Sequence, residues 1–269
     1  MKTLVFSGSG VLFPAHLGAA QRLYEDARSK GIQFPDQVVG TSGGSIVAAF
    51  LSTGAEPKDG LELVRKSMPK EQISMNWPPL LAILFKWGVF NLDKLEKALK
   101  GYVPGKFSEA KLPLHVVTTD VNTQKTIVFS TSNSPNTSVP AAVAASSSIP
   151  IMFSPRKIEP GLLVDGGVTD MIAVDLFPES VGIRLLSEGE GTPKPPKSFV
   201  DYLIAILGAM LSTMERQHIE EALFAKVVTI HLPWNGIDFW RFDEKVLQML
   251  YDKGYQAVDE KLKSGWTWQ

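Results

Sequence analysis

The first fifty residues alternate between short apolar strands and helical patterns, with a glycine turn at each change. The β-prone segment Lys2–Phe6 stops at a turn over positions 7–10, and apolar residues at positions 14–30 then recur at helical spacing. A second strand, Gln37–Val39, passes through another glycine turn into the apolar helix Ser45–Leu51. Strands that alternate with helices are typical of a mainly parallel sheet. We therefore expect an α/β fold with helices on both faces of the sheet.

The same alternation continues along the rest of the chain. Further strands are expected at Leu114–Thr118, Thr126–Phe129, Leu162–Val164, Val181–Leu185 and Val227–Leu232, with helices at Leu92–Lys100, Ala141–Ser146 and Phe242–Leu262. The segments Ser130–Pro140 and Glu188–Lys197 have the composition of loops. With 269 residues, 44% of them hydrophobic, the chain can bury one large core. We expect a single domain over residues 1–269.

Composition excludes several classes of function. The 27 Lys and Arg residues nearly balance the 28 Asp and Glu residues, so no overall positive field would attract nucleic acid. Cysteine is absent, which excludes disulfides, thiolate catalysis and zinc-thiolate sites. We expect neither a metal nor a cofactor. The first apolar run is too short for a signal peptide, and none reaches the roughly 18 residues of a spanning helix. A cytoplasmic or peripheral membrane protein is expected.

The turn around Ser42 fits the Gly-x-Ser-x-Gly nucleophile elbow, here Gly40-Thr41-Ser42-Gly43-Gly44. In that motif a strained turn from strand to helix lifts the serine hydroxyl above the sheet, and small flanking residues allow the turn. A plain glycine-rich turn is the structural alternative. The expected strand before the turn and helix after it favour a nucleophile.

A serine nucleophile needs a neighbouring base to accept its proton. The chain has four histidines, namely His16, His115, His218 and His231. The order Ser42, Asp165 and then His218 or His231 is also that of an α/β-hydrolase triad. That reading is disfavoured because the nucleophile of an α/β-hydrolase follows several strands, and only one strand is expected before the strand of Ser42. His218 falls in a helical stretch and His231 in a strand, where structural roles are the more common ones.

Two other glycine turns carry groups that suit this chemistry. Gly8-Ser9-Gly10 places backbone N–H groups at a helix N-terminus, where they can stabilise an oxyanion or hold a phosphate. The dinucleotide-binding fingerprint fails at Phe13, and no P-loop lysine follows. Asp165-Gly166-Gly167 follows an apolar strand, so a carboxylate emerges at the strand end. Each turn taken alone is compatible with an ordinary structural role.

Taken together and in this order, the segments resemble the patatin-like phospholipases over nearly all of residues 2–185. The segments that carry the resemblance are Phe6–Gly10 with Ala15–Gly18, similar to the family's oxyanion loop and following helix; Gly40–Gly44, similar to its elbow; and Ala145–Pro150 and Asp165–Gly167, similar to its Ile-Pro and Asp-Gly-Gly stretches. The resemblance implies a three-layer α/β/α sandwich and a Ser-Asp dyad without histidine. It also implies hydrolysis of acyl esters of glycerolipids such as phospholipids.

By that mapping Ser42 attacks the ester, Asp165 accepts its proton, and the N–H groups of Gly8, Ser9 and Gly10 hold the oxyanion, while His16 is structural. Because an Asp carboxyl ordinarily titrates near ~3.9 and N–H donors oppose the effect of burial, we expect activity to rise with pH through roughly 4 to 5.5.

The chain departs from the family in the oxyanion loop. The family usually continues with Lys or Arg and another Gly where this chain has Leu12 and Phe13, and the family's middle glycine is Ser9. Losing the cation removes a positive charge from beside the oxyanion site, so an unusual rate or substrate preference is expected. The alternatives are an esterase of short soluble esters and a non-catalytic lipid-binding module.

Several apolar stretches are candidate lipid contacts. Residues 77–87 combine a proline break with Trp77, Leu81, Leu84 and Trp87, which suits a lid or an anchor on substrate or membrane; a buried helix is the alternative. Residues 202–211 are expected to be core. The C-terminal tryptophans, Trp234, Trp240, Trp266 and Trp268, either meet lipid or pack a helix onto the sheet, and the helical spacing over 242–262 favours packing.

Overall fold

The fold is described from a computed structural model. The described residues are 2–67, 74–75, 85–159, 161–177, 179–187, 195–199, 202–203, 205–211, 213, 227–232 and 243–268. None of the described helices is long and apolar enough to cross a bilayer.

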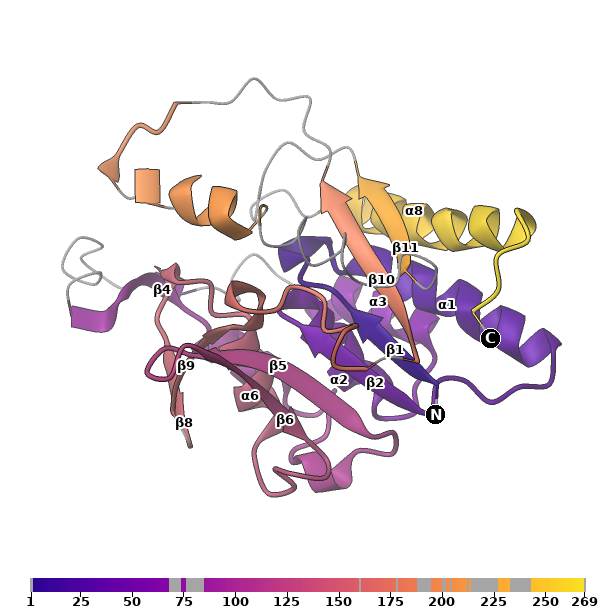
Figure 1. The fold of residues 1–269 in the computed structure, drawn as a ribbon, viewed down its shortest axis with the longest axis horizontal. Helices are drawn as coiled ribbons and strands as arrows, with labels where there is room; N and C mark the ends of the chain where they lie inside the picture. Colours follow the sequence, from indigo (N-terminus) through magenta and orange to yellow (C-terminus); the bar gives the residue numbers. More distant parts are fainter. Residues whose placement is uncertain are drawn as a thin grey trace.

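The centre of the molecule is a mixed, mainly parallel sheet (Figure 1). Its strands are β1 (Thr3–Phe6), β2 (Gln37–Thr41), β5 (Leu114–Asp120), β6 (Lys125–Ser130), β8 (Arg156–Ile158), β9 (Gly161–Asp165), β10 (Ser180–Ser187) and β11 (Val227–Leu232). The order is β11-β10-β1-β2-β5-β9-β8, with β6 also paired to β5. Strands β11, β10, β1, β2 and β5 are parallel, whereas β6, β8 and β9 join through antiparallel pairs. The expected α/β fold is confirmed.

Helices cover one face of the sheet. They are α1 (Pro14–Ser29), α2 (Gly43–Leu51), α3 (Pro57–Ser67), α5 (Asp93–Leu99), α6 (Val139–Ser146) and α8 (Glu244–Lys263). Together with side chains such as Leu4, Phe6, Val38 and Val116 they form one core. A small separate sheet contains β3 (Ser74–Met75), β4 (Gly88–Asn91) and β7 (Ile151–Phe153).

The opposite face of the sheet carries the segment that connects β9 to β10. There Val5, Val39 and Val117 pack against Ile172, Ala173 and Val174, and within the described residues this covering segment is irregular and not helical. The cause is the path of the chain, because the connection from β9 to β10 has to cross β2 and β1 to reach the far side of β1. An extended segment spans that distance with few residues.

Strands β2 and β9 meet end to end along one edge of β5. The other edge of β5 is paired with β6 from His115 to Asp120. On the shared edge, β2 ends with Thr41 opposite Val117, and β9 runs the opposite way and ends with Asp165 opposite Thr118. The residue after β2 and the last residue of β9 are therefore brought face to face by strand register alone.

The pair α1 and α8 closes the helical side behind β10 and β11 (Figure 1). A Cβ at Gly18 would lie 1.9 Å from the Tyr251 carbonyl oxygen, and one at Gly254 would lie 1.9 Å from that of Ala15, so only glycine permits this close approach. Trp268 is buried against Phe34, with ring centroids 4.4 Å apart, and donates to Asp26 at 2.7 Å. The packing role expected for the C-terminal aromatics is confirmed for Trp268; Trp234 and Trp240 lie outside the described residues.

Candidate active site

Ser42 occupies a strained turn between β2 and α2. Its backbone has φ 52° and ψ −125°, a region that a non-glycine residue rarely enters. The turn is tight enough that a Cβ at Gly40 would lie 2.3 Å from the Gly44 carbonyl oxygen. Strain of this kind costs on the order of 1–3 kcal/mol and persists only where the surrounding structure imposes it. The geometry is that of a nucleophile elbow.

Hydrogen bonds hold the backbone of Ser42 at both its N–H and its carbonyl. Its N–H donates to Ser146 Oγ at 2.8 Å, and that hydroxyl donates in turn to the carbonyl of Val117 at 2.6 Å. The Ser42 carbonyl accepts from Ser45 Oγ at 2.6 Å. The strained residue is thus tied both to the central strand and to its own helix.

The Ser42 hydroxyl donates to Asp165 Oδ2 at 2.6 Å. The other carboxyl oxygen, Oδ1, accepts the N–H of Gly167 at 2.8 Å. Thr119 Oγ1 donates to the backbone carbonyl of Asp165 at 2.9 Å and fixes the strand end. The structure therefore brings the two predicted residues into direct contact across 123 positions of sequence.

Burial raises the pKa of the Asp165 carboxyl to about 7, and the hydrogen bonds from Ser42 and Gly167 only partly oppose it. Two donors are too few to replace the water that a carboxylate loses in this enclosed site. This shift moves the expected acid limb of activity from pH 4–5.5 to near pH 7. A carboxyl that titrates near neutral pH is well matched to accepting and returning a proton.

The loop Gly8-Ser9-Gly10, which is the predicted oxyanion loop, lies against the start of α2. A Cβ at Gly43 would be 2.3 Å from the Gly10 carbonyl oxygen and 2.6 Å from Ser9 Oγ. The Gly8 N–H donates to the Met171 carbonyl at 2.8 Å, so the expectation that it serves as an oxyanion donor is corrected. Within the described residues the N–H groups of Ser9, Gly10 and Gly43 have no acceptor. These three are the candidate oxyanion donors.

Apolar packing anchors this loop where the family usually carries a cation. Leu12 and Phe13 are both buried in the core. Phe13 also lines a small apolar cavity of about 50 Å³ together with Ile46 and Phe50 of α2. The loop is thus fixed by burial, and the backbone donors keep their place without the charge.

The described histidines lie away from the dyad. His16 Nε2 faces the Ser7 carbonyl at 3.0 Å, and burial lowers its pKa to about 3, so it is a neutral structural residue. His115 Nε2 contacts Gln37 Oε1 at 3.1 Å. His231 is exposed on β11, three strand spacings, or about 14 Å, from the strand of Ser42. His218 lies outside the described residues.

Sequence reasoning missed two neighbours of the site. Ser146 belongs to a stretch of three serines, and nothing in that stretch distinguishes the one that reaches Ser42. Met171 packs on the loop, since a Cβ at Gly8 would lie 2.3 Å from its sulfur atom. Among the described residues no cluster of three His, Asp or Glu side chains could hold a metal ion.

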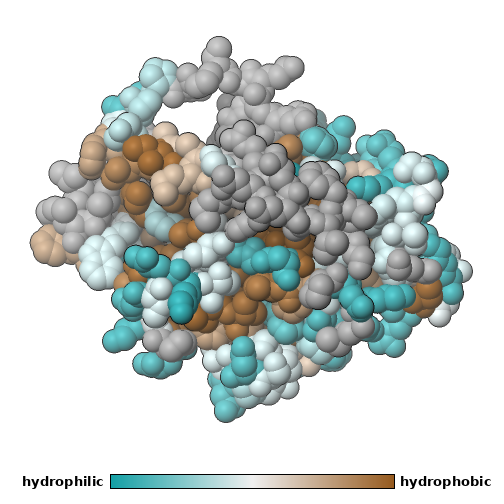
Figure 2. Space-filling model, in the orientation of Figure 1, coloured by the Kyte–Doolittle hydropathy of each residue, from teal (hydrophilic) through white to brown (hydrophobic). Residues whose placement is uncertain are grey.

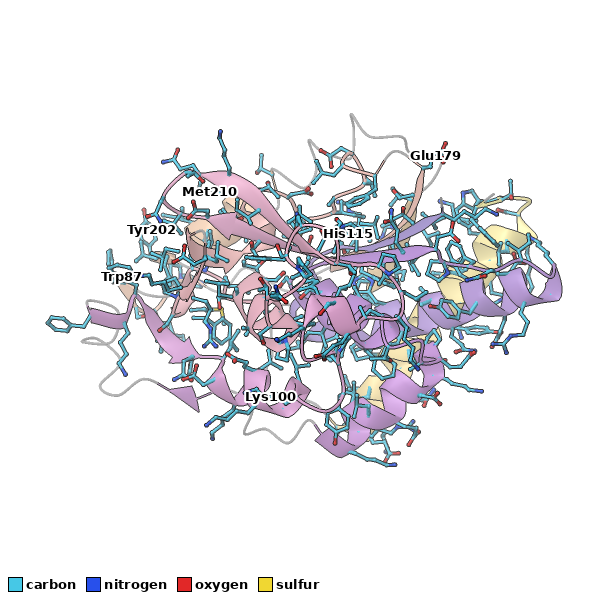
Figure 3. All side chains as sticks on the ribbon, turned by 90° about the horizontal axis from the view of Figure 1, so that it is seen from below. Trp87, Lys100, His115, Glu179, Tyr202 and Met210 are labelled. Atoms are coloured by element: carbon cyan, nitrogen blue, oxygen red, sulfur yellow. The ribbon has the colours of Figure 1, made fainter. Side chains whose placement is uncertain are left out.

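An exposed apolar surface lies at one end of the molecule. Trp87 is 58% exposed beside Phe85, while the predicted contacts Trp77, Leu81 and Leu84 lie outside the described residues. The helical stretch within 199–213, drawn in orange in Figure 1, has no buried residue among those described, so the expectation that 202–211 is core is wrong. Figure 3 shows Trp87, Tyr202 and Met210 at the same end, away from His115.

Comparisons with known proteins agree with this fold. The model of the patatin-like phospholipase family matches residues 4–178. The uncharacterized protein R571 of Acanthamoeba polyphaga mimivirus is 25% identical over 97% of this chain and 94% of its own length. The uncharacterized protein YqhO of Bacillus subtilis is 26% identical over 98% of both chains.

Two solved structures share the fold at low sequence identity. VipD from Legionella pneumophila superposes with a TM-score of 0.58 at 17% identity, over 98% of this chain and 67% of VipD. ExoU, in its heterodimeric complex with SpcU from the type III secretion system of Pseudomonas aeruginosa, gives a TM-score of 0.51 at 18% identity. That match covers 99% of this chain but only 52% of the other, so this chain spans about half its length.

Proposed function

Because the chain belongs to the patatin-like phospholipase family, we propose that it is a serine acyl hydrolase that cleaves carboxylic esters of glycerolipids. One observation carries the proposal, the 2.6 Å hydrogen bond from the Ser42 hydroxyl to Asp165, in an elbow beside N–H groups that have no acceptor among the described residues. We take residues 1–269 as one catalytic domain that works without a cofactor.

In the first half-reaction the Ser42 oxygen attacks the ester carbonyl carbon while its proton passes to Asp165 Oδ2. The negative charge that develops on the carbonyl oxygen is stabilised by the N–H groups of Ser9, Gly10 and Gly43, which are already oriented and carry no other acceptor within the described residues. Collapse of this intermediate breaks the ester bond, and the leaving alcohol takes the proton from Asp165. The product is an acyl ester of Ser42.

In the second half-reaction a water molecule replaces the alcohol. Asp165 accepts a proton from the water as the water oxygen attacks the acyl carbon, and the same donors hold the second oxyanion. When the intermediate collapses, the free carboxylic acid leaves and the proton returns to the Ser42 oxygen. The pKa of Asp165 near neutral pH supports both proton transfers, because the carboxylate can accept the proton and the carboxylic acid can then give it back.

The apolar surface supports a lipid substrate and a peripheral contact with a membrane. Phe199 is 73% exposed and Met210 is 58% exposed, and the sequence from position 202 to position 210 carries no charged residue. An all-round apolar helix is normally buried, so exposure indicates a surface that is covered when the protein works. Figure 2 shows apolar residues gathered over this stretch. Trp87 beside Lys86 adds the aromatic and cationic pair that suits a lipid-water boundary.

Labelling with a serine-directed fluorophosphonate tests the catalytic assignment. We expect one label per chain at Ser42, and none in the Ser42→Ala protein. Folded protein that takes up no label would contradict the proposal and favour the non-catalytic lipid-binding module. Labelling combined with turnover of short esters alone would favour the soluble esterase.

The lipid part is tested by replacing Trp87 with Ala and both Ile206 and Met210 with Ser. Activity on phospholipid vesicles should fall several-fold while activity on a short soluble ester is retained, because the changes remove apolar contact area and leave the dyad intact. Leu176→Ser is the matched control, since Leu176 is 48% exposed on the segment that covers the other face of the sheet. Equal losses on both substrates would refute the lipid contact.

A further inference from the structure

The end of helix α6 contacts both residues of the dyad. Ser146, its last residue, is completely buried and links the Ser42 N–H to the carbonyl of Val117. Two residues further on, the Ser148 carbonyl accepts the Asp165 N–H at 2.9 Å. One short segment therefore holds the nucleophile from one side and the base from the other.

We propose that Ser146 is a positioning residue that sets the geometry of the Ser42 nucleophile, an inference that rests on the proposed function. Its hydroxyl is the only described acceptor of the Ser42 N–H. Among the described residues this N–H has no backbone carbonyl as its acceptor. The side chain of Ser146 supplies the acceptor that the strained turn lacks.

The second hydrogen bond of Ser146, to the Val117 carbonyl, fixes the orientation of its hydroxyl as an acceptor. By donating to the Val117 carbonyl, Ser146 Oγ has its proton directed at the central strand and its lone pairs directed at Ser42. Val117 stands opposite Thr41 in the β2–β5 pairing. The Ser146 hydroxyl thus ties Ser42 to β5, the same strand that positions Asp165 through Thr118.

Removing the Ser146 hydroxyl takes this partner from two buried backbone groups, the Ser42 N–H and the Val117 carbonyl. The turn can relieve the loss only by moving Ser42. A misplacement of about 1 Å can cost roughly 100-fold in rate. We expect Ser146→Ala to lower kcat on a soluble ester by about 10- to 100-fold while KM changes less than about 2-fold. The rate constant for fluorophosphonate labelling should fall in parallel.

Ser52→Ala is the matched control. Ser52 is also completely buried, and its hydroxyl donates only to the Ala49 carbonyl, at 2.7 Å, at the far end of α2. The Ser52→Ala variant loses one buried hydrogen bond, but Ser52 touches no residue of the site. Its kcat should therefore be unchanged even where the Tm falls. Equal losses of kcat in the two variants, after correction for the folded fraction, would overturn the proposal.

A second substitution covers the case in which Ser146→Ala does not fold. Ser146→Cys keeps a slightly larger group that is a weaker donor and acceptor at the same position, and should give a kcat between those of the wild type and the Ala protein. A folded Cys or Ala variant with wild-type kcat would overturn the role of Ser146. If Ser42→Ala keeps its activity, the proposed function fails instead, so the two failures are distinguishable.

Discussion

Asp120 and Asp165 end two strands that pair with each other, β5 and β9, and both side chains are almost fully shielded, at 3% and 4% exposed. Asp120 lies in the β5–β6 hairpin and accepts hydrogen bonds from the N–H groups of Asn122, Thr123 and Leu162 and from the Thr123 hydroxyl. These donors, the Thr123 hydroxyl foremost, lower its pKa. Asp165 has two donors, and burial raises its pKa to about 7.

The difference shows what separates a structural carboxylate from a candidate base. Four donors favour the ionised form of Asp120, which stabilises the hairpin, and they already occupy the carboxylate oxygens. The second donor of Asp165, the Ser42 hydroxyl, is the group whose proton would be transferred. A carboxylate with few donors is costly to bury, and that cost is consistent with a catalytic role.

The largest effect should separate the two aspartates by activity. Asp165→Asn should lower kcat at least about 1,000-fold, because an amide keeps the shape but cannot accept the Ser42 proton. Asp120→Asn should leave kcat within about 2-fold where the protein is folded. Steady-state turnover of a soluble ester measures both. Comparable losses of kcat in the two variants would show that Asp165 and Asp120 do not differ as base and structural carboxylate.

The next effect concerns pH. Asp165 must be ionised to accept a proton, so kcat/KM should fall about tenfold per pH unit below its pKa near 7 and level off above it. A histidine base would give a similar limb, so the same profile is measured in His231→Ala and His218→Ala. A limb that disappears in either variant would replace the dyad with a histidine triad.

Stability should move in opposite directions in the two variants. The folded pKa of Asp165 is raised, so the wild type loses stability as the pH rises from about 4 to about 7, and above that range the full cost is present. Asp165→Asn should therefore be more stable at pH 8, on the order of 2–4 kcal/mol, with the gain vanishing below pH 4. Urea unfolding at pH 4, 6 and 8 measures this.

Asp120 should show the reverse dependence. Its folded pKa is lowered, so its contribution is present above the ordinary aspartate pKa and is lost as the pH falls below that value. Asp120→Asn should therefore lower the Tm at pH 8 and have little effect in strong acid. A higher Tm at pH 8 in this variant would show that the hairpin donors do not stabilise the carboxylate.

The smallest effect is expected at His115. Burial lowers its pKa, and its Nε2 contacts Gln37 at the opposite end of β5 from the dyad. His115→Ala should change kcat by less than about 2-fold, with a modest drop in Tm from the lost contact with Phe177. A large loss of activity in a folded variant would place this histidine in the catalytic machinery.

The Ser-Asp dyad was predicted from the resemblance to the family, and each member matches a family motif that is local in sequence. Ser42 stands between a strand and a helix, and Asp165 ends an apolar strand before two glycines. Their contact depends on long-range register, since β2 and β9 must share one edge of β5, and no local pattern records that. The donors of each carboxylate are equally non-local, so the direction of the Asp165 pKa shift was beyond sequence reasoning.

Two other misjudgements have the same origin. The engagement of Gly8 depends on Met171, which lies 163 positions away yet packs on the loop. The stretch 202–211 has the composition of a core helix, but composition reports only how apolar a segment is and not whether the protein covers it. In both cases the local sequence pattern was interpreted correctly. A contact with a distant residue decided the role of Gly8, and the absence of such a contact among the described residues decided the exposure of 202–211.

The end-to-end meeting of β2 and β9 has a consequence for the order in which the protein is synthesised. The strand, turn and helix that carry Ser42 end at residue 51, but the carboxylate of Asp165 ends a strand that is synthesised much later. A growing chain therefore carries a serine without a base until β5 is in place and β9 docks on the remaining part of its edge. By the proposed mechanism, ester hydrolysis should begin only after residue 165 has left the ribosome, so the onset of activity reports the docking of β9 on β5.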